Sequence, residues 1–245
     1  EQTGRQVVVL IDEYDKPLLQ TIHNEPLQEA YRHIMKAFYG VLKSADRYLR
    51  FVFLTGVTKF AQVRVFSDLN QLNDISYDYA TLCGITHAEL VDNLTPELEQ
   101  LGQMQSLSRK ETVETMVRQY DGYHFHPSRE GVFNPFSALS ALRKREFGDY
   151  WFQTGTPTFL VELLKKSEFD LRILIDGVET QASAFTEYCA ERNNPIPLLY
   201  QSGYLTIKEY DPRFKLYKLE FPNEEVRYGF LNFITPFYSS IRSVR

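Results

Sequence analysis

The sequence predicts a mixed fold, α/β in its first part and α+β in its last. In the first part, two short apolar runs enclose an amphipathic helical pattern, and a strand–helix–strand unit of this length implies a parallel sheet. In the last part, two strand-like segments joined by a short loop lie between helical patterns. Helix-start signals repeat in the stretch between them. We therefore expect three parts, residues 1–85, 86–194 and 195–245.

The first part begins with Val7–Ile11, an apolar and β-branched run that predicts a strand buried on both faces. Phe51–Leu54 predicts a second buried strand. A helix between them is expected to cover the sheet with one apolar face, made of Leu27, Tyr31, Ile34, Phe38 and Leu42. Ligands of parallel sheets bind beyond the carboxyl ends of the strands. That edge would hold Asp12, Glu13 and Thr55.

The middle part is predicted to be a helical subdomain. Thr86 with Glu89 and Ser108 with Glu111 are spaced as capping boxes, in which a hydroxyl and a carboxylate satisfy free backbone N–H groups. Two further helix starts place a capping residue before proline, at Asn134-Pro135 and Thr156-Pro157.

The last part is predicted to contain a hairpin, with strands at Tyr204–Tyr210 and Lys215–Phe221. Asn223 would then cap a final helix whose first turn carries Glu224 and Glu225. Helix, hairpin and helix together outline a winged helix.

Composition excludes several classes of protein. Of the 245 residues 43% are hydrophobic and 24% charged, which excludes disordered and fibrous chains. The net charge of −5 argues against nucleic-acid binding over the whole surface, although seven basic and five acidic residues after position 194 leave local DNA contact open. Cys83 and Cys189 form no CxxC pair, which argues against a zinc site or a disulfide scaffold as the basis of the fold. The longest apolar run has five residues, too few to span a bilayer. We expect a cytoplasmic protein that does not enter membranes.

The run that ends in Asp12-Glu13 is typical of the Walker B strand of P-loop ATPases. In that chemistry the first carboxylate orients Mg²⁺ on the β- and γ-phosphates, and the second activates the attacking water. A solvated strand end fits the pattern about as well. Thr55, at the end of the next strand, occupies the place of a γ-phosphate sensor, but a lone threonine is more often a turn former.

Other candidates have simpler alternatives. Asp15 and Lys16 could pair with each other or touch nucleotide, but a solvated surface is favoured. Lys59 and Arg64 are possible phosphate contacts. A metal-binding role for the pair His124 and His126 is disfavoured, because no third ligand lies nearby.

Aromatic residues along the predicted hairpin could stack on bases beside lysines, although such residues more often cover a domain interface. The residues concerned are Tyr204, Tyr210, Tyr217 and Phe221, with Lys208, Lys215 and Lys218.

Blocks spread over nearly the whole chain resemble the bacterial AAA-ATPase-like family. They are Ile11–Leu18, Phe53–Phe60, Phe66–Asn70, Asn73–Ser76, Tyr120–Tyr123, Asn134–Ser137, Tyr150–Pro157 and Phe221–Val226. Members resemble STAND-type ATPases, with an N-terminal P-loop half, a helical lid and a winged helix, and commonly carry a PD-(D/E)xK nuclease-like domain. The resemblance implies Mg²⁺ and ATP as cofactors, Asp12 as the Mg²⁺ ligand, Glu13 as the water-activating base and Thr55 as sensor. It places Asp121-Gly122-Tyr123 in the lid segment that packs toward the nucleotide.

The chain lacks two motifs that this family carries, the phosphate-binding loop of the ATPase and the motif of the nuclease-like domain. No glycine precedes a lysine, so the phosphate-binding G-x-x-x-x-G-K-[ST] loop is absent, and no lysine follows an acidic residue at the spacing of a nuclease site. A buried strand only six residues after Glu1, without an initial methionine, predicts a fragment. We expect part of a P-loop NTPase sheet, from the Walker B strand onward.

These departures predict a fragment that is inactive alone and that self-associates through an uncovered sheet. The alternative is a non-catalytic interaction or DNA-binding module that uses the winged helix. A G-x-x-x-x-G-K-[ST] loop encoded about 100–200 residues upstream of Asp12 would favour the ATPase, whereas a natural start near Glu1 would favour the module.

Overall fold

The computed structural model describes residues 4–21, 24–57, 72–76, 78–154, 160, 164, 169–186 and 194–242. The chain divides into two compact units. The first unit consists of residues 1–74, 158–169 and 183–202, and the second consists of residues 75–157, 170–182 and 203–245.

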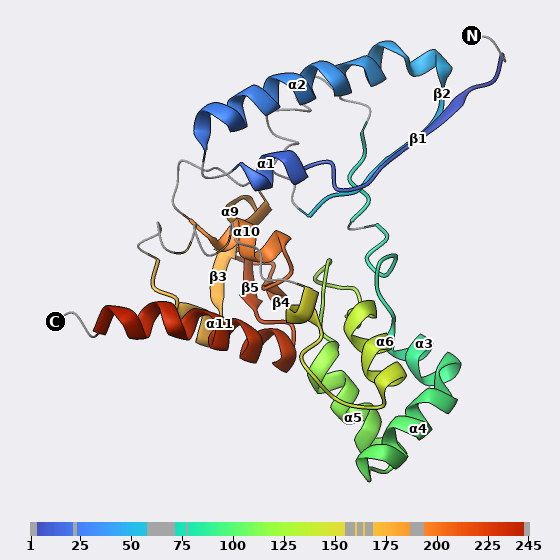
Figure 1. Cartoon of the computed structure of the whole chain (residues 1–245), viewed down its shortest axis with the longest axis vertical. Helices are drawn as coiled ribbons and strands as arrows, with labels where there is room; N and C mark the ends of the chain where they lie inside the picture. Colours follow the sequence, from blue (N-terminus) through green and yellow to red (C-terminus); the bar gives the residue numbers. More distant parts are fainter. Residues whose placement is uncertain are drawn as a thin grey trace. The chain divides into compact units, whose positions relative to one another are not determined.

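The first unit contains the predicted strand–helix–strand arrangement. Strand β1 (Val7–Ile11) pairs in parallel with β2 (Leu49–Leu54), with Ile11 opposite Leu54. Helices α1 (Lys16–Gln20) and α2 (Glu25–Ser44) and the 3₁₀ helix η1 (Asp46–Tyr48) connect the strands (Figure 1). The short helices α9 (Ser183–Thr186) and α10 (Ile196–Gln201) belong to the same unit.

The core of this unit lies on one side of α2. It consists of Leu18, Leu19, Met35, Tyr39 and Leu198. Asn24 begins α2, because its side chain accepts a hydrogen bond from the N–H of Leu27 at 3.2 Å. Helix α2 therefore contains the expected stretch from Leu27 to Leu42.

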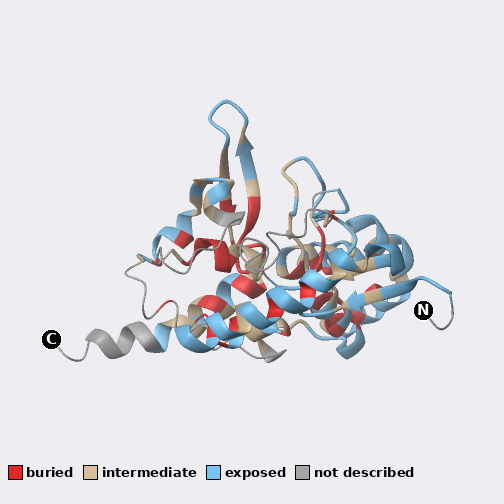
Figure 2. Cartoon of the chain, turned by 90° about the horizontal axis from the view of Figure 1, so that it is seen from above, coloured by how far each residue is buried: buried red, intermediate tan, exposed pale blue. Residues whose placement is uncertain are grey.

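Two predictions of burial in the first unit are wrong. Leu10 in β1 is 68% exposed, and Ile34 and Phe38 of the predicted sheet-covering face are 63% and 61% exposed. Figure 2 draws the strand next to the N-terminus largely in the exposed colour. The physical reason is that this sheet has two strands in the described part of the chain, so one sheet face and one stripe of α2 have no layer packed on them.

The second unit starts with helices. These are α3 (His87–Asn93), α4 (Thr95–Gln105), α5 (Arg109–Tyr120) and α6 (Pro135–Lys144). Both predicted capping boxes are formed, at Thr86 and Ser108, and Asn134 caps α6. The helices enclose a core of fully buried side chains that includes Leu90, Leu98, Leu101, Met116, Tyr120 and Phe133. The cap predicted at Thr156 lies outside the described residues.

An antiparallel sheet completes the second unit. Strands β4 (Thr206–Asp211) and β5 (Leu216–Glu220) form the predicted hairpin, and β3 (Val178–Gln181) pairs with the other edge of β5. The 3₁₀ helix η2 (Trp151–Thr154), α8 (Ile173–Asp176) and α11 (Glu224–Arg242) belong to the same unit, and Figure 1 shows the strands side by side. Asn223 caps α11, since its Oδ1 accepts the N–H of Val226 at 3.1 Å.

The chain is thus a mixed α/β protein, with one small parallel and one antiparallel sheet among the residues that the structure describes. Four finer assignments stay predictions: a partial P-loop NTPase sheet, a helical lid, a winged helix and a three-part division. No helix in the described ranges is long and apolar enough to cross a bilayer.

Candidate functional site

The carboxyl ends of β1 and β2 bring two predicted site residues together. The backbone N–H of Thr55 donates to the carbonyl of Ile11 at 2.8 Å, and the N–H of Tyr14 donates back to the carbonyl of Thr55 at 2.9 Å. These bonds continue the ladder of the parallel sheet past the last paired residues. The loop after β1 and the turn after β2 are therefore fixed against each other.

Asp12 and Thr55 make direct side-chain contact at this edge. The Thr55 hydroxyl donates to Oδ1 of Asp12, and the same oxygen accepts the N–H of Glu13 at 3.0 Å. The second carboxylate oxygen, Oδ2, has no hydrogen-bond partner among the residues that the structure describes, and Asp12 is exposed. A free carboxylate oxygen beside a hydroxyl suits a hard cation such as Mg²⁺, which takes one or two carboxylates together with water and phosphate oxygens.

Glu13 lies at the same edge but its carboxylate is engaged. Its backbone has φ +53°, a left-handed conformation that is uncommon for glutamate. Its Oε2 accepts a hydrogen bond from Nζ of Lys16 at 2.5 Å, and this bond raises the pKa of Lys16. Lys16 is exposed, as expected, but it pairs with Glu13. To activate a water molecule, the Glu13 carboxylate would have to exchange this ion pair for water.

Asp15 corrects the prediction of a solvated surface. It is fully buried, and its Oδ1 accepts the N–H of Val57 at 3.2 Å. Burial and the neighbouring charge of Asp15 raise the pKa of Tyr14. The sequence offered one signal for this contact, namely Gly56 at the strand end, which permits close approach of another segment.

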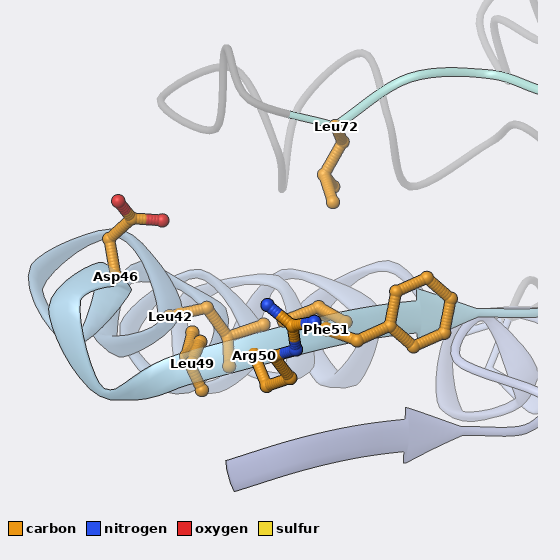
Figure 3. A pocket seen from close by; sticks show the side chains of 7 residues that line it. Leu42, Asp46, Leu49, Arg50, Phe51 and Leu72 are labelled. Atoms are coloured by element: carbon orange, nitrogen blue, oxygen red, sulfur yellow. The ribbon is translucent and has the colours of Figure 1, made fainter. Parts of the chain in front are cut away.

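The remaining predicted phosphate contacts are not tested by the structure. Lys59 and Arg64 lie outside the described residues. A pocket of about 230 Å³ lies at the start of β2 (Figure 3). It is lined mainly by apolar side chains, with Asp46 and Arg50 among them. It is therefore at the opposite end of β2 from Thr55.

Asp121, Gly122 and Tyr123 lie in the second unit, where they contact the segment before α11. The side-chain amide of Asn223 donates to the carbonyl of Asp121 at 2.9 Å. Gly122 has φ +98°, and a Cβ there would lie 2.3 Å from the carbonyl oxygen of Pro222. Nζ of Lys208 donates to the carbonyls of Gly122 and Pro222, at 3.2 and 2.8 Å. These contacts account for glycine at this position, and the role of the segment in a lid stays a prediction.

A carboxylate close in sequence to these contacts is buried, which the sequence did not predict. Glu225, expected only to interact with the start of α11, is fully buried, and its Oε1 accepts the N–H of Trp151 at 2.8 Å. Its Oε2 and the hydroxyls of Ser137 and Tyr123 are buried and form no hydrogen bond of ordinary geometry in the described part of the chain. Burial raises the pKa of Glu225, and the nearby Ser137 hydroxyl opposes this shift with a smaller effect.

The hairpin residues proposed for base stacking have other partners. The rings of Tyr210 and Tyr217 pack against each other at a tilt of 39°, with centroids 4.5 Å apart, while Tyr204 packs against Phe230 of α11. Burial lowers the pKa of Lys208. Lys218 pairs with two glutamates of the hairpin. These contacts favour an internal role for the hairpin over base stacking.

The two histidines considered as metal ligands bond to nearby groups. A ring nitrogen of His124 contacts the carbonyl of Arg129 at 3.3 Å, and one of His126 accepts the N–H of Ser128 at 3.1 Å. Over the described ranges, no three His, Cys, Asp or Glu side chains are grouped as a metal site would require.

The leading segment of the first unit is similar to a known family. A family model described as "Predicted AAA-ATPase" (AAA-ATPase_like) matches residues 1–66, which include the Asp12–Thr55 edge. A protein of Azotobacter chroococcum mcd 1, described as "Uncharacterized protein in vnfD 5'region", is 38% identical over 231 residues. The match covers 91% of this chain and 42% of that protein, so the chain spans less than half of its relative's length. No solved structure matches the chain.

Proposed function

We propose that the chain is the Walker B and sensor part of a cytoplasmic, Mg²⁺- and ATP-dependent switch of the AAA/STAND type. The observation that carries the proposal is the contact between Asp12 and Thr55 at the carboxyl edge of two parallel strands. The match of residues 1–66 to a predicted AAA-ATPase family supports it. The absence of a phosphate-binding loop from the sequence supports the further proposal that the chain hydrolyses nothing alone.

Each residue of the edge has a distinct proposed role. Asp12 holds Mg²⁺ through the carboxylate oxygen that faces away from Thr55. Bound Mg²⁺ would bridge the β- and γ-phosphates of ATP and neutralise their charge. Glu13 orients the attacking water once its carboxylate is no longer paired with Lys16. Thr55 senses the γ-phosphate through its hydroxyl.

The hairpin provides little support for the alternative, a DNA-binding module. Lys208 is committed to two backbone carbonyls and Lys218 to two glutamates, while Arg213 pairs with Asp211 at 3.0 Å. Among the basic residues of the described hairpin, this leaves exposed Lys215 for direct attraction of phosphates. We therefore place the function at the Asp12 edge.

The first test uses this chain and Mn²⁺ as a probe for Mg²⁺. Sub-stoichiometric Mn²⁺ broadens amide resonances close to a bound ion, even when binding is weak. We expect selective broadening around Asp12 and Thr55 that disappears in Asp12→Ala. The matched control is Asp46→Ala, an exposed aspartate at the other end of β2, which should leave the broadening unchanged. Broadening that is centred elsewhere, or that survives Asp12→Ala, would refute the metal site.

The second test uses the longest polypeptide that the gene encodes. If that polypeptide includes G-x-x-x-x-G-K-[ST] upstream, we expect ATP turnover that Glu13→Gln abolishes while Mg²⁺-dependent binding of ATP persists. Asp12→Ala should lose the Mg²⁺ dependence of binding, and Asp46→Ala should alter neither property. Unchanged turnover in Glu13→Gln, or a gene without the phosphate-binding loop, would contradict the proposal.

A further inference from the structure

The fully buried side chain of Asp15 serves the neighbouring turn. Asp15 begins α1, and its backbone carbonyl accepts the N–H groups of Leu18 and Leu19 at 3.0 and 3.1 Å. Its carboxylate makes no capping bond to this helix. Instead, Oδ1 accepts the N–H of Val57, 42 positions further along the chain. A carboxylate that could cap its own helix in solvent is thus buried against the turn after β2.

The turn after β2 lies so close to Asp15 that only glycine fits between them. A Cβ placed on Gly56 would lie 2.6 Å from a ring carbon of Tyr14 and 2.8 Å from Oδ1 of Asp15. Both separations are below any ordinary van der Waals contact. The backbone of the turn therefore packs directly on Tyr14 and Asp15, and the Asp15–Val57 hydrogen bond closes this contact.

Hydrogen bonds to the loop after β1 hold both sides of Thr55. Its own N–H and carbonyl bond to Ile11 and Tyr14, at 2.8 and 2.9 Å. Beyond it, Val57 bonds to Asp15. The path of the backbone determines where the Thr55 hydroxyl lies, and that hydroxyl reaches Asp12. Loss of the Val57 bond would free the far side of the turn and widen the range of positions open to the hydroxyl.

We infer that Asp15 is a positioning residue for the Asp12–Thr55 pair. It holds the turn of Thr55–Val57 so that Thr55 orients the Asp12 carboxylate, with one oxygen hydrogen-bonded and the other available to a divalent cation. This inference rests on the proposed function of the edge. Outer partners that orient a metal ligand commonly change metal affinity about 10–100-fold when removed.

The experiment compares Asp15→Ala with Asp15→Asn. Asparagine keeps an oxygen that can accept the Val57 N–H, whereas alanine removes it. In Asp15→Ala we expect hydrogen exchange at Val57 to accelerate and Mn²⁺ affinity at Asp12 to fall about tenfold. In Asp15→Asn both quantities should stay close to the wild-type values. Asp46→Ala controls for removal of an aspartate from the same unit.

The possible results separate this inference from the proposed function. Fast exchange at Val57 with unchanged Mn²⁺ affinity would make Asp15 merely structural and overturn the inference. If the wild-type chain binds no Mn²⁺ at Asp12, the proposed function fails. In that case the positioning role is tested without metal. Asp15→Ala should shift the amide resonances of Asp12 and Thr55, and unshifted resonances would overturn the role. Should Asp15→Ala not fold, Asp15→Leu with the rescue by Asp15→Asn provides the same comparison.

Discussion

Replacing Glu225 with glutamine should stabilise the second unit, and more strongly at high pH. Glutamine keeps an oxygen for the Trp151 N–H, which Glu225 Oε1 accepts at 2.8 Å. Its amide group also replaces Oε2, a buried atom with no hydrogen bond of ordinary geometry in the described residues, with a donor that the hydroxyl oxygen of Ser137 or Tyr123 can accept. An ionised carboxylate can only accept from these hydroxyls, and the Ser137 hydroxyl only partly opposes the effect of burial on the pKa of Glu225.

The expected gain at pH 8 is about 1–3 kcal/mol in the free energy of unfolding, the usual cost of an unsatisfied buried polar group. For a chain of this size that corresponds to about 2–4 °C in Tm per kcal/mol. Burial raises the pKa of Glu225, so the protonated form is the one that favours folding. This contribution is fully present below the unfolded pKa of about 4.3 and is lost as the pH rises through the folded pKa. The variant's advantage should therefore vanish near pH 4.

Thermal and urea unfolding from pH 4 to 8 test this expectation. The control is Glu224→Gln, since Glu224 is more exposed and makes an ion pair with Arg118 at 3.2 Å. Loss of that pair should cost at most about 1 kcal/mol. A Glu225→Gln variant that is less stable than wild type at pH 8, or whose advantage does not change with pH, would refute the reasoning.

Three further substitutions test other contacts. Gly56→Ala should lower the free energy of unfolding in urea by about 1–3 kcal/mol, because the added methyl group overpacks the turn. Gly40→Ala, with open space around it in α2, should raise it by about 0.5–1 kcal/mol. Equal effects would contradict the tight contact at Gly56. Lys208→Met should lower stability by about 1–3 kcal/mol because two partly buried carbonyls lose their donor. A similar loss from exposed Lys215→Met would argue against this cause. Phe38→Gln should reduce self-association in sedimentation velocity without lowering Tm, and unchanged association would show that the exposed stripe of α2 is not the contact.

The sequence predicted features that depend on near neighbours. The capping boxes at Thr86 and Ser108, the parallel pairing of β1 with β2 and the β4–β5 hairpin all follow from local patterns, and the structure contains them. Strand β3 was missed, because Val178–Gln181 carries one apolar residue and exists through pairing with β5.

Burial could not be predicted where it depends on distant segments. The apolar face of α2 was assigned to the core because amphipathicity shows that a face seeks cover but not what covers it. Asp15 was assigned to the surface because carboxylates are rarely buried. Its burial comes from Val57 and the missing side chain of Gly56, which a local pattern does not reveal.

The hydrogen bonds between the end of α5 and the start of α11 couple the orientations of the two helices. One side chain, Asn223, caps α11 and also holds the carbonyl of Asp121 at the end of α5. Nζ of Lys208 also donates to the carbonyls of Gly122, which follows Asp121, and of Pro222, which precedes Asn223. Rotation of α5 against α11 would break these partly buried hydrogen bonds together, because they share the same short segments. The bonds therefore couple the orientation of the end of α5 to that of the start of α11.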